Sequence, residues 1–192
     1  MSAKLDSNGR PRVLVVGGGF AGIGAVQKLK KSDVDVVLVD KHDYHTFQPL
    51  LYQVATGLLE QTAVGHPIRD LVQKQANARF HQDTVTAIDL DAREVRFSEL
   101  DPLTYDYLVL GLGAEVNFFG VEGAPEHAFP LYTLADAVRL KSHVLKTWEA
   151  ADRNPALIDD GALNIVVVGG GPTGIETAGA LAELYHGVFP KD

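Results

Sequence analysis

The stretch Val13-Leu-Val-Val-Gly-Gly-Gly-Phe-Ala-Gly-Ile23 joins four apolar residues of the β type to a turn with the pattern Gly17-x-Gly19-x-x-Gly22. A helical pattern follows the turn, and a second apolar run, 35–40, ends in Asp40, about 20 residues further on. The glycines allow a tight turn, close approach of a pyrophosphate and close packing of helix on strand. This order of elements predicts a dinucleotide-binding βαβ unit.

The same pattern returns near the other end of the sequence. Ile165-Val-Val-Val-Gly-Gly-Gly-Pro-Thr-Gly-Ile175 again places four apolar residues before three glycines and a helical pattern. Neither glycine run continues into Gly-Lys-Ser/Thr, so a P-loop is excluded. The repeat predicts two dinucleotide-binding units in series.

The sequence between the repeats has mixed patterns. We expect a helix over 67–75, a buried strand over 107–110, a helix over 133–149 capped by Thr133, and a polar linker over 152–161. The helix at 133–149 places Leu134, Val138, Leu145 and Trp148 on one face, with Trp148 as a core anchor. Three short β-rich runs, 79–80, 85–90 and 94–97, predict a small antiparallel meander.

Composition excludes several classes of function. The 17 basic and 25 acidic residues give a formal net charge of −8, which disfavours nucleic acid as a partner. No apolar run approaches the ~20 residues needed to span a bilayer. The sequence has no cysteine, so it has no disulfide and no thiolate metal site. His42 and His45 are close in sequence but in a loop pattern, and we predict no metal site. Residues 1–11 form a polar leader rather than a secretory signal, which favours an intracellular protein.

The first glycine turn has a simple electrostatic character. No Lys or Arg occurs between Val13 and Gln27, so backbone amides and the helix N-terminus would hold the phosphates. Asp40 would accept hydrogen bonds from the hydroxyls of an adenosine ribose. In the second unit, Glu176 is either a favourable charge near a helix N-terminus or a residue that faces the reacting rings of the cofactors.

Two longer segments identify a family. Tyr44-His-Thr-Phe-Gln-Pro-Leu-Leu-Tyr-Gln-Val-Ala-Thr-Gly57 and Gly169-Gly-Gly-Pro-Thr-Gly-Ile-Glu-Thr-Ala-Gly-Ala-Leu-Ala-Glu183, together with the two turns, closely resemble the N-terminal part of type II NADH:quinone oxidoreductases. The two-turn plan alone is shared by many flavoprotein reductases of the pyridine nucleotide-disulfide oxidoreductase type. The resemblance implies an α/β, Rossmann-like fold with a parallel sheet, a small antiparallel meander and a truncated two-dinucleotide architecture.

The resemblance also implies roles for individual residues. The residues that match the FAD site are Gly17, Gly19, Phe20, Ala21, Gly22, Asp40, Lys41, Pro49, Leu50, Val85, Gly113 and Ala114. Those that match the NADH site are Gly169, Gly171, Pro172, Thr173, Gly174 and Glu176, and Gln53 matches the quinone side. Glu176 is the candidate catalytic residue, with His45 and Tyr52 as other candidate proton donors to quinone. In 111–114, which resembles the Ala-Thr-Gly motif, Leu112 stands where the motif has Thr, so the resemblance does not carry over a hydroxyl contact there.

The implied activity is transfer of a hydride from NADH to FAD and of electrons to a membrane quinone, without proton pumping. The implied partners are NADH, a quinone, a second copy in a homodimer and the cytoplasmic side of a membrane, contacted peripherally through a region absent here. We expect residues 12–160 to belong to the FAD-binding domain and 161–192 to begin the NADH-binding domain. As such a fragment, the chain would be soluble and inactive by itself.

Three alternatives remain. A sulfide:quinone reductase shares the plan but needs redox cysteines, which the sequence lacks. Another FAD- and NAD(P)H-dependent reductase would pass its electrons to a different acceptor. A non-enzymatic redox or nucleotide sensor would use cofactor occupancy to change a protein contact.

Overall fold

The computed structural model describes residues 9–188, which fall into two compact units. The first unit contains residues 9–45 and 66–114, and the second contains 46–65 and 115–188. Most of the predicted polar leader lies outside the described residues. The short strands β3 (Tyr44–Thr46) and β4 (Gly65–Pro67) pair where the chain leaves and re-enters the first unit.

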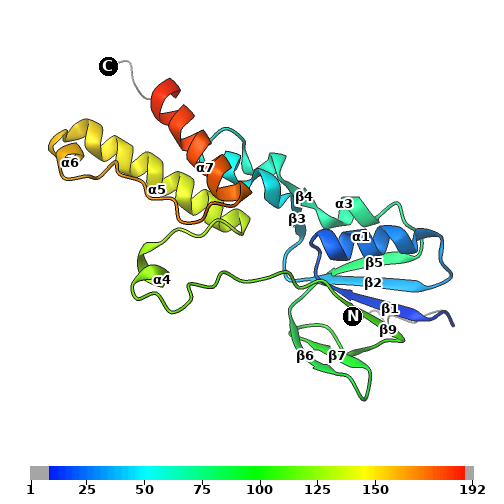
Figure 1. The fold of residues 1–192 in the computed structure, drawn as a ribbon. Helices are drawn as coiled ribbons and strands as arrows, with labels where there is room; N and C mark the ends of the chain where they lie inside the picture. The colour runs from blue at the N-terminus through cyan, green and yellow to red at the C-terminus, as the bar shows by residue number, and fades with distance from the viewer. Residues whose placement is uncertain (1–8, 189–192) are drawn as a thin grey trace. The chain divides into compact units, whose positions relative to one another are not determined.

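The first unit is built on a four-stranded parallel sheet (Figure 1). Its strand order is β5 (Ala78–Gln82), β2 (Asp35–Asp40), β1 (Arg12–Val16) and β9 (Tyr107–Leu110). All three neighbouring pairs run parallel, with Val15 opposite Leu38 on one side and Val109 on the other. The predicted α/β fold with a parallel sheet is confirmed.

The central strands are continuously apolar because both of their faces are covered. On one face, Val13 and Val15 pack with residues of α1 (Phe20–Lys28) and α3 (Ile68–Val72). On the other face, Leu14 and Val16 pack with residues of the small antiparallel sheet. Figure 1 shows α1 and α3 on one side of the sheet and the hairpin of β6 (Val85–Asp89) and β7 (Glu94–Phe97) on the other.

The small antiparallel sheet forms as predicted, but one of its three predicted strands is wrong. The antiparallel sheet consists of β6 (Val85–Asp89), β7 (Glu94–Phe97) and β8 (Leu103–Thr104), whereas β5 joins the parallel sheet beside β2. Phe80 of β5 is buried in the core with α1 and α3. Short β runs of this kind look alike in sequence, and only the available partner decides which sheet each joins.

Two other predictions in this unit need correction. The helix predicted over 67–75 covers only Ile68–Val72, with Pro67 in the N-cap position. The strand Tyr107–Leu110 forms as predicted, but Tyr107 and Leu110 are exposed. Because β1 is the only strand of residues 9–188 that pairs with β9, β9 lies at an edge of the described sheet.

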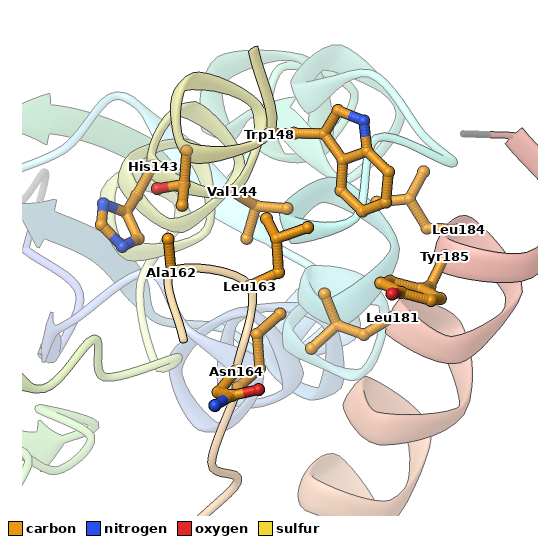
Figure 2. Close-up of a pocket in the computed structure, with 11 residues that line it drawn as sticks. His143, Val144, Trp148, Ala162, Leu163, Asn164, Leu181, Leu184 and Tyr185 are labelled. Carbon is orange, nitrogen blue, oxygen red and sulfur yellow. The ribbon is translucent and has the colours of Figure 1, made fainter. Parts of the chain in front are cut away.

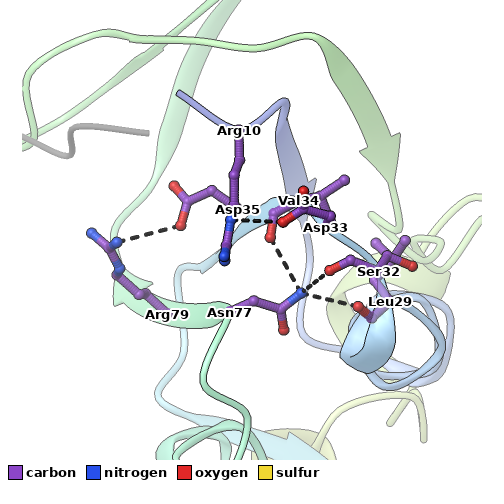
Figure 3. Close-up of polar contacts among 8 residues, drawn as sticks. All are labelled: Arg10, Leu29, Ser32, Asp33, Val34, Asp35, Asn77 and Arg79. Atoms are coloured by element: carbon purple, nitrogen blue, oxygen red, sulfur yellow. Dashed lines mark hydrogen bonds and ion pairs between the residues drawn. The ribbon is translucent and has the colours of Figure 1, made fainter. Parts of the chain in front are cut away.

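Polar side chains anchor the start of β2 (Figure 3). The Asn77 amide donates to the carbonyl oxygens of Leu29, Ser32 and Val34 at 3.0–3.2 Å. It thereby ties the segment after α1, which contains the 3₁₀ turn η1 (Leu29–Lys31), to the residue just before β5. The buried carboxylate of Asp35 lies 3.4 Å from the Arg79 guanidinium on the neighbouring strand.

The second unit is helical within the part of the chain that is described. Leu51, Val54 and Ala137 are among the buried residues of its core, where α2 (Leu51–Ala55) meets α5 (Leu134–Arg153). Its other elements are η2 (Gln48–Leu50), η3 (Gln61–Ala63), α4 (Ala124–His127), α6 (Ala156–Asp159), α7 (Pro172–Glu183) and the π-helical turn η4 (Leu184–Val188).

The predicted helix over 133–149 is confirmed, and it continues to Arg153. Thr133 caps it in a capping box, in which the Thr133 hydroxyl accepts from the Asp136 amide at 3.1 Å and the Asp136 carboxylate accepts from the Thr133 amide at 2.9 Å. The predicted buried face is wrong in part, because Val138 and Leu145 are exposed whereas Ala137 and Ala151 are buried. The predicted linker over 152–161 contains the end of α5 and all of α6.

The apolar run before the second glycine turn, residues 165–168, forms no strand. All four of its side chains are exposed, Val166 by 83% and Val168 by 93%. A parallel strand needs a neighbour to supply hydrogen bonds, and no element of the described chain pairs with this segment. No helix within residues 9–188 is long and apolar enough to cross a bilayer.

Candidate dinucleotide-binding site

The first glycine turn lies at the carboxyl end of β1, and close backbone contacts require glycine at two of its positions, Gly17 and Gly22. A Cβ atom on Gly22 would lie 1.8 Å from the carbonyl oxygen of Gly17. Gly17 has φ = 104°, and a Cβ there would lie 2.2 Å from the carbonyl oxygen of Gly111. Real Cβ atoms do not approach so closely, so this packing of β1, α1 and the end of β9 needs glycine at both positions.

The outer side of the turn is open. A Cβ added to Gly19 would meet no atom within 4 Å, and Gly19, Phe20 and Ala21 are exposed. Gly19 is the N-cap of α1 and carries no side chain to occupy the helix N-terminus. Amides at such a terminus favour an anion. The residues present therefore fit a pyrophosphate held by backbone groups alone.

Asp40 lies at the end of β2 beside the turn. Its carboxylate accepts from the Gly18 amide through one oxygen and from the His42 amide, at 2.7 Å, through the other. Each carboxylate oxygen has a further lone pair available. The acid predicted to bind a ribose thus also supports the glycine turn, and its contact with ribose stays a prediction.

His45 contacts the first glycine turn in a way that the sequence did not predict. Its buried ring lies under the turn, with Nδ1 2.9 Å from the Gly18 carbonyl oxygen. The ring also packs edge-on against Phe20, with centroids 5.1 Å apart. The sequence offered His45 only as a candidate proton donor, because a histidine in a loop pattern carries no signal of the backbone that it contacts.

The segment after β9 contributes backbone to the same region. The Gly111 amide donates to the Val16 carbonyl oxygen at 2.8 Å, which places 111–114 beside the first turn. Gly113 has φ = 74°, a conformation that favours glycine, and both Gly113 and Ala114 are exposed. The structure thus brings this segment to the same sheet edge as Gly17 and Asp40.

Two further predicted residues lie near the end of β5. Lys41 is exposed, and its carbonyl oxygen accepts from the Gln82 side chain at 3.1 Å. Val85 is half-buried at the start of β6. The Asp83 amide donates to the Asp40 carbonyl oxygen at 2.9 Å, which joins this corner to the carboxyl end of β2.

The buried carboxylate of Asp83 fixes the corner between β5 and β6. It accepts from the amides of Thr84, Glu99 and Leu100 at 2.6–3.1 Å. Burial by itself raises the pKa of Asp83, but the amides of Leu100, Thr84, Glu99 and Ser98 together outweigh burial and lower it. On β5, burial and then the charges of Arg69 and Arg79 lower the pKa of His81.

The second glycine turn repeats the local geometry of the first. Gly169 has φ = 113°, and a Cβ on Gly174 would lie 2.0 Å from the Gly169 carbonyl oxygen. The N-cap Gly171 has φ = −76° and ψ = 176°, close to the −75° and −169° of Gly19. The turn therefore forms without a paired strand before it, and Gly171, Pro172 and Thr173 are exposed on it.

Glu176 is the fifth residue of α7 and is exposed. The first turn of α7 contains no acidic residue, which weakens the interpretation of Glu176 as a charge that stabilises the helix N-terminus. Its proposed part in the chemistry stays a prediction.

The segment that the resemblance predicts to lie beside the flavin, residues 49–53, belongs to the second unit. Pro49 and Leu50 lie in η2, with Pro49 exposed, and Gln53 lies in α2. The Gln53 amide donates to the Tyr52 hydroxyl at 3.2 Å. The roles of these residues toward flavin and quinone stay predictions.

The second unit also contains a mostly apolar pocket (Figure 2). Its walls come from α5, from 162–165 and from α7 with η4, and they include Trp148, Asn164, Leu181 and Tyr185. Trp148 packs edge-on against Tyr185, with ring centroids 5.3 Å apart, and is half-buried as a packing residue. None of the predicted cofactor residues lines this pocket.

Comparison with known proteins agrees with the geometry of the turns. The pyridine nucleotide-disulphide oxidoreductase family matches residues 11–189. The chain belongs to this family. Its two glycine turns and parallel sheet are accordingly those of a pyridine nucleotide-disulphide oxidoreductase. Within the described residues, the segment before the second turn, 165–168, forms no strand.

Among relatives, the chain is 40% identical over 180 residues to the type II NADH:quinone oxidoreductase NdhA of Mycobacterium tuberculosis. The match covers 92% of this chain and 38% of the relative. It is 31% identical over 199 residues to the mitochondrial external alternative NADH-ubiquinone oxidoreductase of Yarrowia lipolytica, with 96% of this chain and 34% of the relative covered. This pyridine nucleotide-disulphide oxidoreductase chain thus spans less than half the length of these relatives.

Solved structures show the same fold. NDH2 from Plasmodium falciparum, solved in complex with NADH, matches with a TM-score of 0.80 at 23% identity and covers 93% of this chain and 38% of that one. The sulfide:quinone oxidoreductase of Aquifex aeolicus matches with a TM-score of 0.66 at 28% identity and covers 76% of this chain and 33% of that one.

Proposed function

We propose that this chain forms the FAD-binding part, over 12–160, and the beginning of the NADH-binding part, over 161–192, of a type II NADH:quinone oxidoreductase. The observation that carries the proposal is the geometry of the first glycine turn. On its inner side, the backbone at Gly17 is in close contact with Gly22 of α1 and with Gly111 after β9, and on its outer side Gly19 is open. Likeness at 40% identity to enzymes of that name supports the assignment.

The chain's own residues would bind and orient the cofactor. The amides at Gly19, Phe20 and Ala21 would hold the pyrophosphate, and Asp40 would accept from the adenosine ribose. Val85 would contact the adenine through its backbone, and Gly113 and Ala114 would border the same site. FAD, when bound, supplies an acceptor for a hydride and a route for electrons to a second substrate.

The second turn would hold NADH in the same way. Gly171, Pro172 and Thr173 surround an open helix N-terminus with no basic side chain, and Gly174 allows the helix to pack closely on the turn. Glu176 would orient the nicotinamide or handle protons at the quinone, with Gln53 on the quinone side. The quinone, contact with a membrane surface and a homodimer belong to the same proposal and rest on the likeness to the relatives.

Titration of the chain with FAD tests the first part of the proposal. We expect saturable quenching of flavin fluorescence, and the natural protein, purified with its cofactor, should be yellow, bleach with NADH and recover with a soluble quinone. Absence of flavin binding would overturn the proposal. Bleaching without recovery by quinone would favour an enzyme with a different electron acceptor.

Asp40→Ala tests the role of the acid at the end of β2. The substitution removes the acceptor of the Gly18 and His42 amides as well as the proposed ribose acceptor. We expect FAD affinity to fall by about 10-fold or more, since hydrogen bonds to a charged group are worth about 1.5–3 kcal/mol. Equal flavin affinity in the variant and the parent would contradict this role.

Two other functions are weaker candidates. A sulfide:quinone reductase shares the fold, but its chemistry needs cysteines and this sequence has none. A nucleotide sensor would bind FAD or NADH without catalysing electron transfer. Sustained turnover of NADH with quinone by the natural protein would exclude the sensor.

A further inference from the structure

The peptide between Gly18 and Gly19 is the feature of the first turn that most needs an external support. Glycine on both sides removes the Cβ atoms that normally restrict rotation of a peptide plane. The peptide is also planar and trans, so the Gly19 N–H points away from the Gly18 carbonyl oxygen. Whatever fixes that carbonyl therefore fixes the direction of the Gly19 N–H.

His45 is the group that fixes it. Nδ1 of the ring lies 2.9 Å from the Gly18 carbonyl oxygen, and a carbonyl oxygen can only accept. The ring therefore donates from Nδ1 to Gly18. The ring is buried, and Phe20 packs against it edge-on, so the donor is held in place by packing.

The neighbouring peptide is held from another direction. Asp40 accepts from the Gly18 N–H, which fixes the plane between Gly17 and Gly18. Gly18 is buried, and a Cβ there would lie 2.4 Å from Cδ1 of Ile68. Two side chains from β2 and β3 thus hold two successive peptide planes, and the exposed face of Gly19 is the one left for a ligand.

We infer that His45 is a positioning residue of the cofactor site, whose Nδ1–H holds the Gly18 carbonyl so that the Gly19 amide is directed at the phosphates. The inference rests on the proposed FAD binding at this turn. The N-cap Gly171 of the second turn has nearly the same dihedral angles as Gly19, so the glycines themselves give the turn its shape. His45 instead removes alternative orientations of the peptide before binding, which favours affinity through preorganisation.

Two variants of similar shape separate the donor from the packing. In His45→Asn, the side-chain amide can place an N–H where Nδ1 stood, whereas His45→Leu keeps comparable bulk without a donor. We expect His45→Leu to bind FAD about 10-fold more weakly than the parent, while His45→Asn stays within about threefold of it. His66→Leu, at an exposed histidine on β4, should not change the affinity.

Nitrogen NMR of the histidine ring gives a readout that does not depend on FAD. We expect the neutral ring of His45 to carry its proton on Nδ1. A neutral ring whose only proton is on Nε2 would overturn the inference. Chemical denaturation of each variant shows whether a change of affinity is only loss of folding.

The outcomes for His45 and for the function are distinct. Equal FAD affinity in the parent, His45→Leu and His45→Asn would overturn the inference and leave the proposed function intact. Equally weak binding by both variants, with both folded, would show that the ring acts by packing and would also overturn the inference. If the parent itself does not bind FAD, both proposals fail.

Discussion

Two glycines of α1, Gly22 and Gly24, differ sharply in what they do, although only Ile23 separates them. Gly22 faces the Gly17 carbonyl oxygen, whereas a Cβ on Gly24 would meet no atom within 4 Å. The first position is therefore controlled by a backbone contact within the turn and the second by helix propensity alone. The two glycines form a matched pair for experiment.

Gly22→Ala should prevent close packing of α1 on the turn. Because its Cβ would lie 1.8 Å from a backbone oxygen, we expect a loss of several kcal/mol, about 2–4, in the free energy of unfolding and loss of FAD binding. Gly24→Ala should instead be neutral or stabilise the chain by up to about 1 kcal/mol. Chemical denaturation of both variants measures the difference, and equal stability of the two would refute the contact.

At the scale of the elements, the corner between β5 and β6 depends on one buried acid. The Asp83 carboxylate accepts from the Thr84 amide within the corner and from the Glu99 and Leu100 amides in the loop after β7. The lowered pKa of Asp83 means that its charged form stabilises the folded chain. This contribution is complete above the ordinary Asp pKa of about 3.9 and is lost as the pH falls through the lower folded value.

Asp83→Asn should lower the free energy of unfolding by about 1–2 kcal/mol at pH 7. The difference from the parent should shrink as the pH falls below 4, because the parent then loses the charge as well. Urea denaturation of both proteins from pH 7 to pH 3 measures this dependence. A difference that stays constant over that range would show that charge does not contribute.

The start of α5 is a second element whose stability comes from local contacts. Thr133 and Asp136 satisfy two backbone amides that would otherwise have no partner in the helix. We expect Thr133→Ala to lower the free energy of unfolding by about 1 kcal/mol. Ser142→Ala, at an exposed position inside α5, provides the control and should have no destabilising effect, since Ala favours a helix.

At the scale of the whole molecule, the segment 165–168 leaves an apolar surface without a partner among the described residues. Val166 and Val168 are 83% and 93% exposed, and the backbone around them is not paired in a sheet. Unpaired apolar segments of this type promote association with other chains. We therefore expect this chain to self-associate as its concentration rises.

Val166→Lys together with Val168→Lys should reduce that association, which sedimentation velocity can measure. The control is Gln27→Lys together with Ser142→Lys. Both positions are exposed on helices, and the pair changes the net charge by the same amount. If the control reduces association equally, repulsion between chains rather than the apolar segment is responsible. Association that neither pair changes would place the contact elsewhere.

The sequence alone determined the local features of this protein. The first strand, turn and helix, the acid at Asp40 and the cap at Thr133 follow from the order of residues within about 30 positions, and each is present in the structure. The second turn shows the reason most clearly. Its glycine conformation and its helix form beside an unpaired segment, because both depend on nearby backbone sterics.

Only the tertiary structure decided which distant groups meet. The assignment of β5 to the parallel sheet, the exposure of β9 and the absence of a strand at 165–168 all depend on which neighbours are available. The contact of His45 with Gly18 joins residues 27 positions apart through a buried ring. Such contacts arise from packing between elements, and the periodicity of one segment carries no information about the partner that it will find.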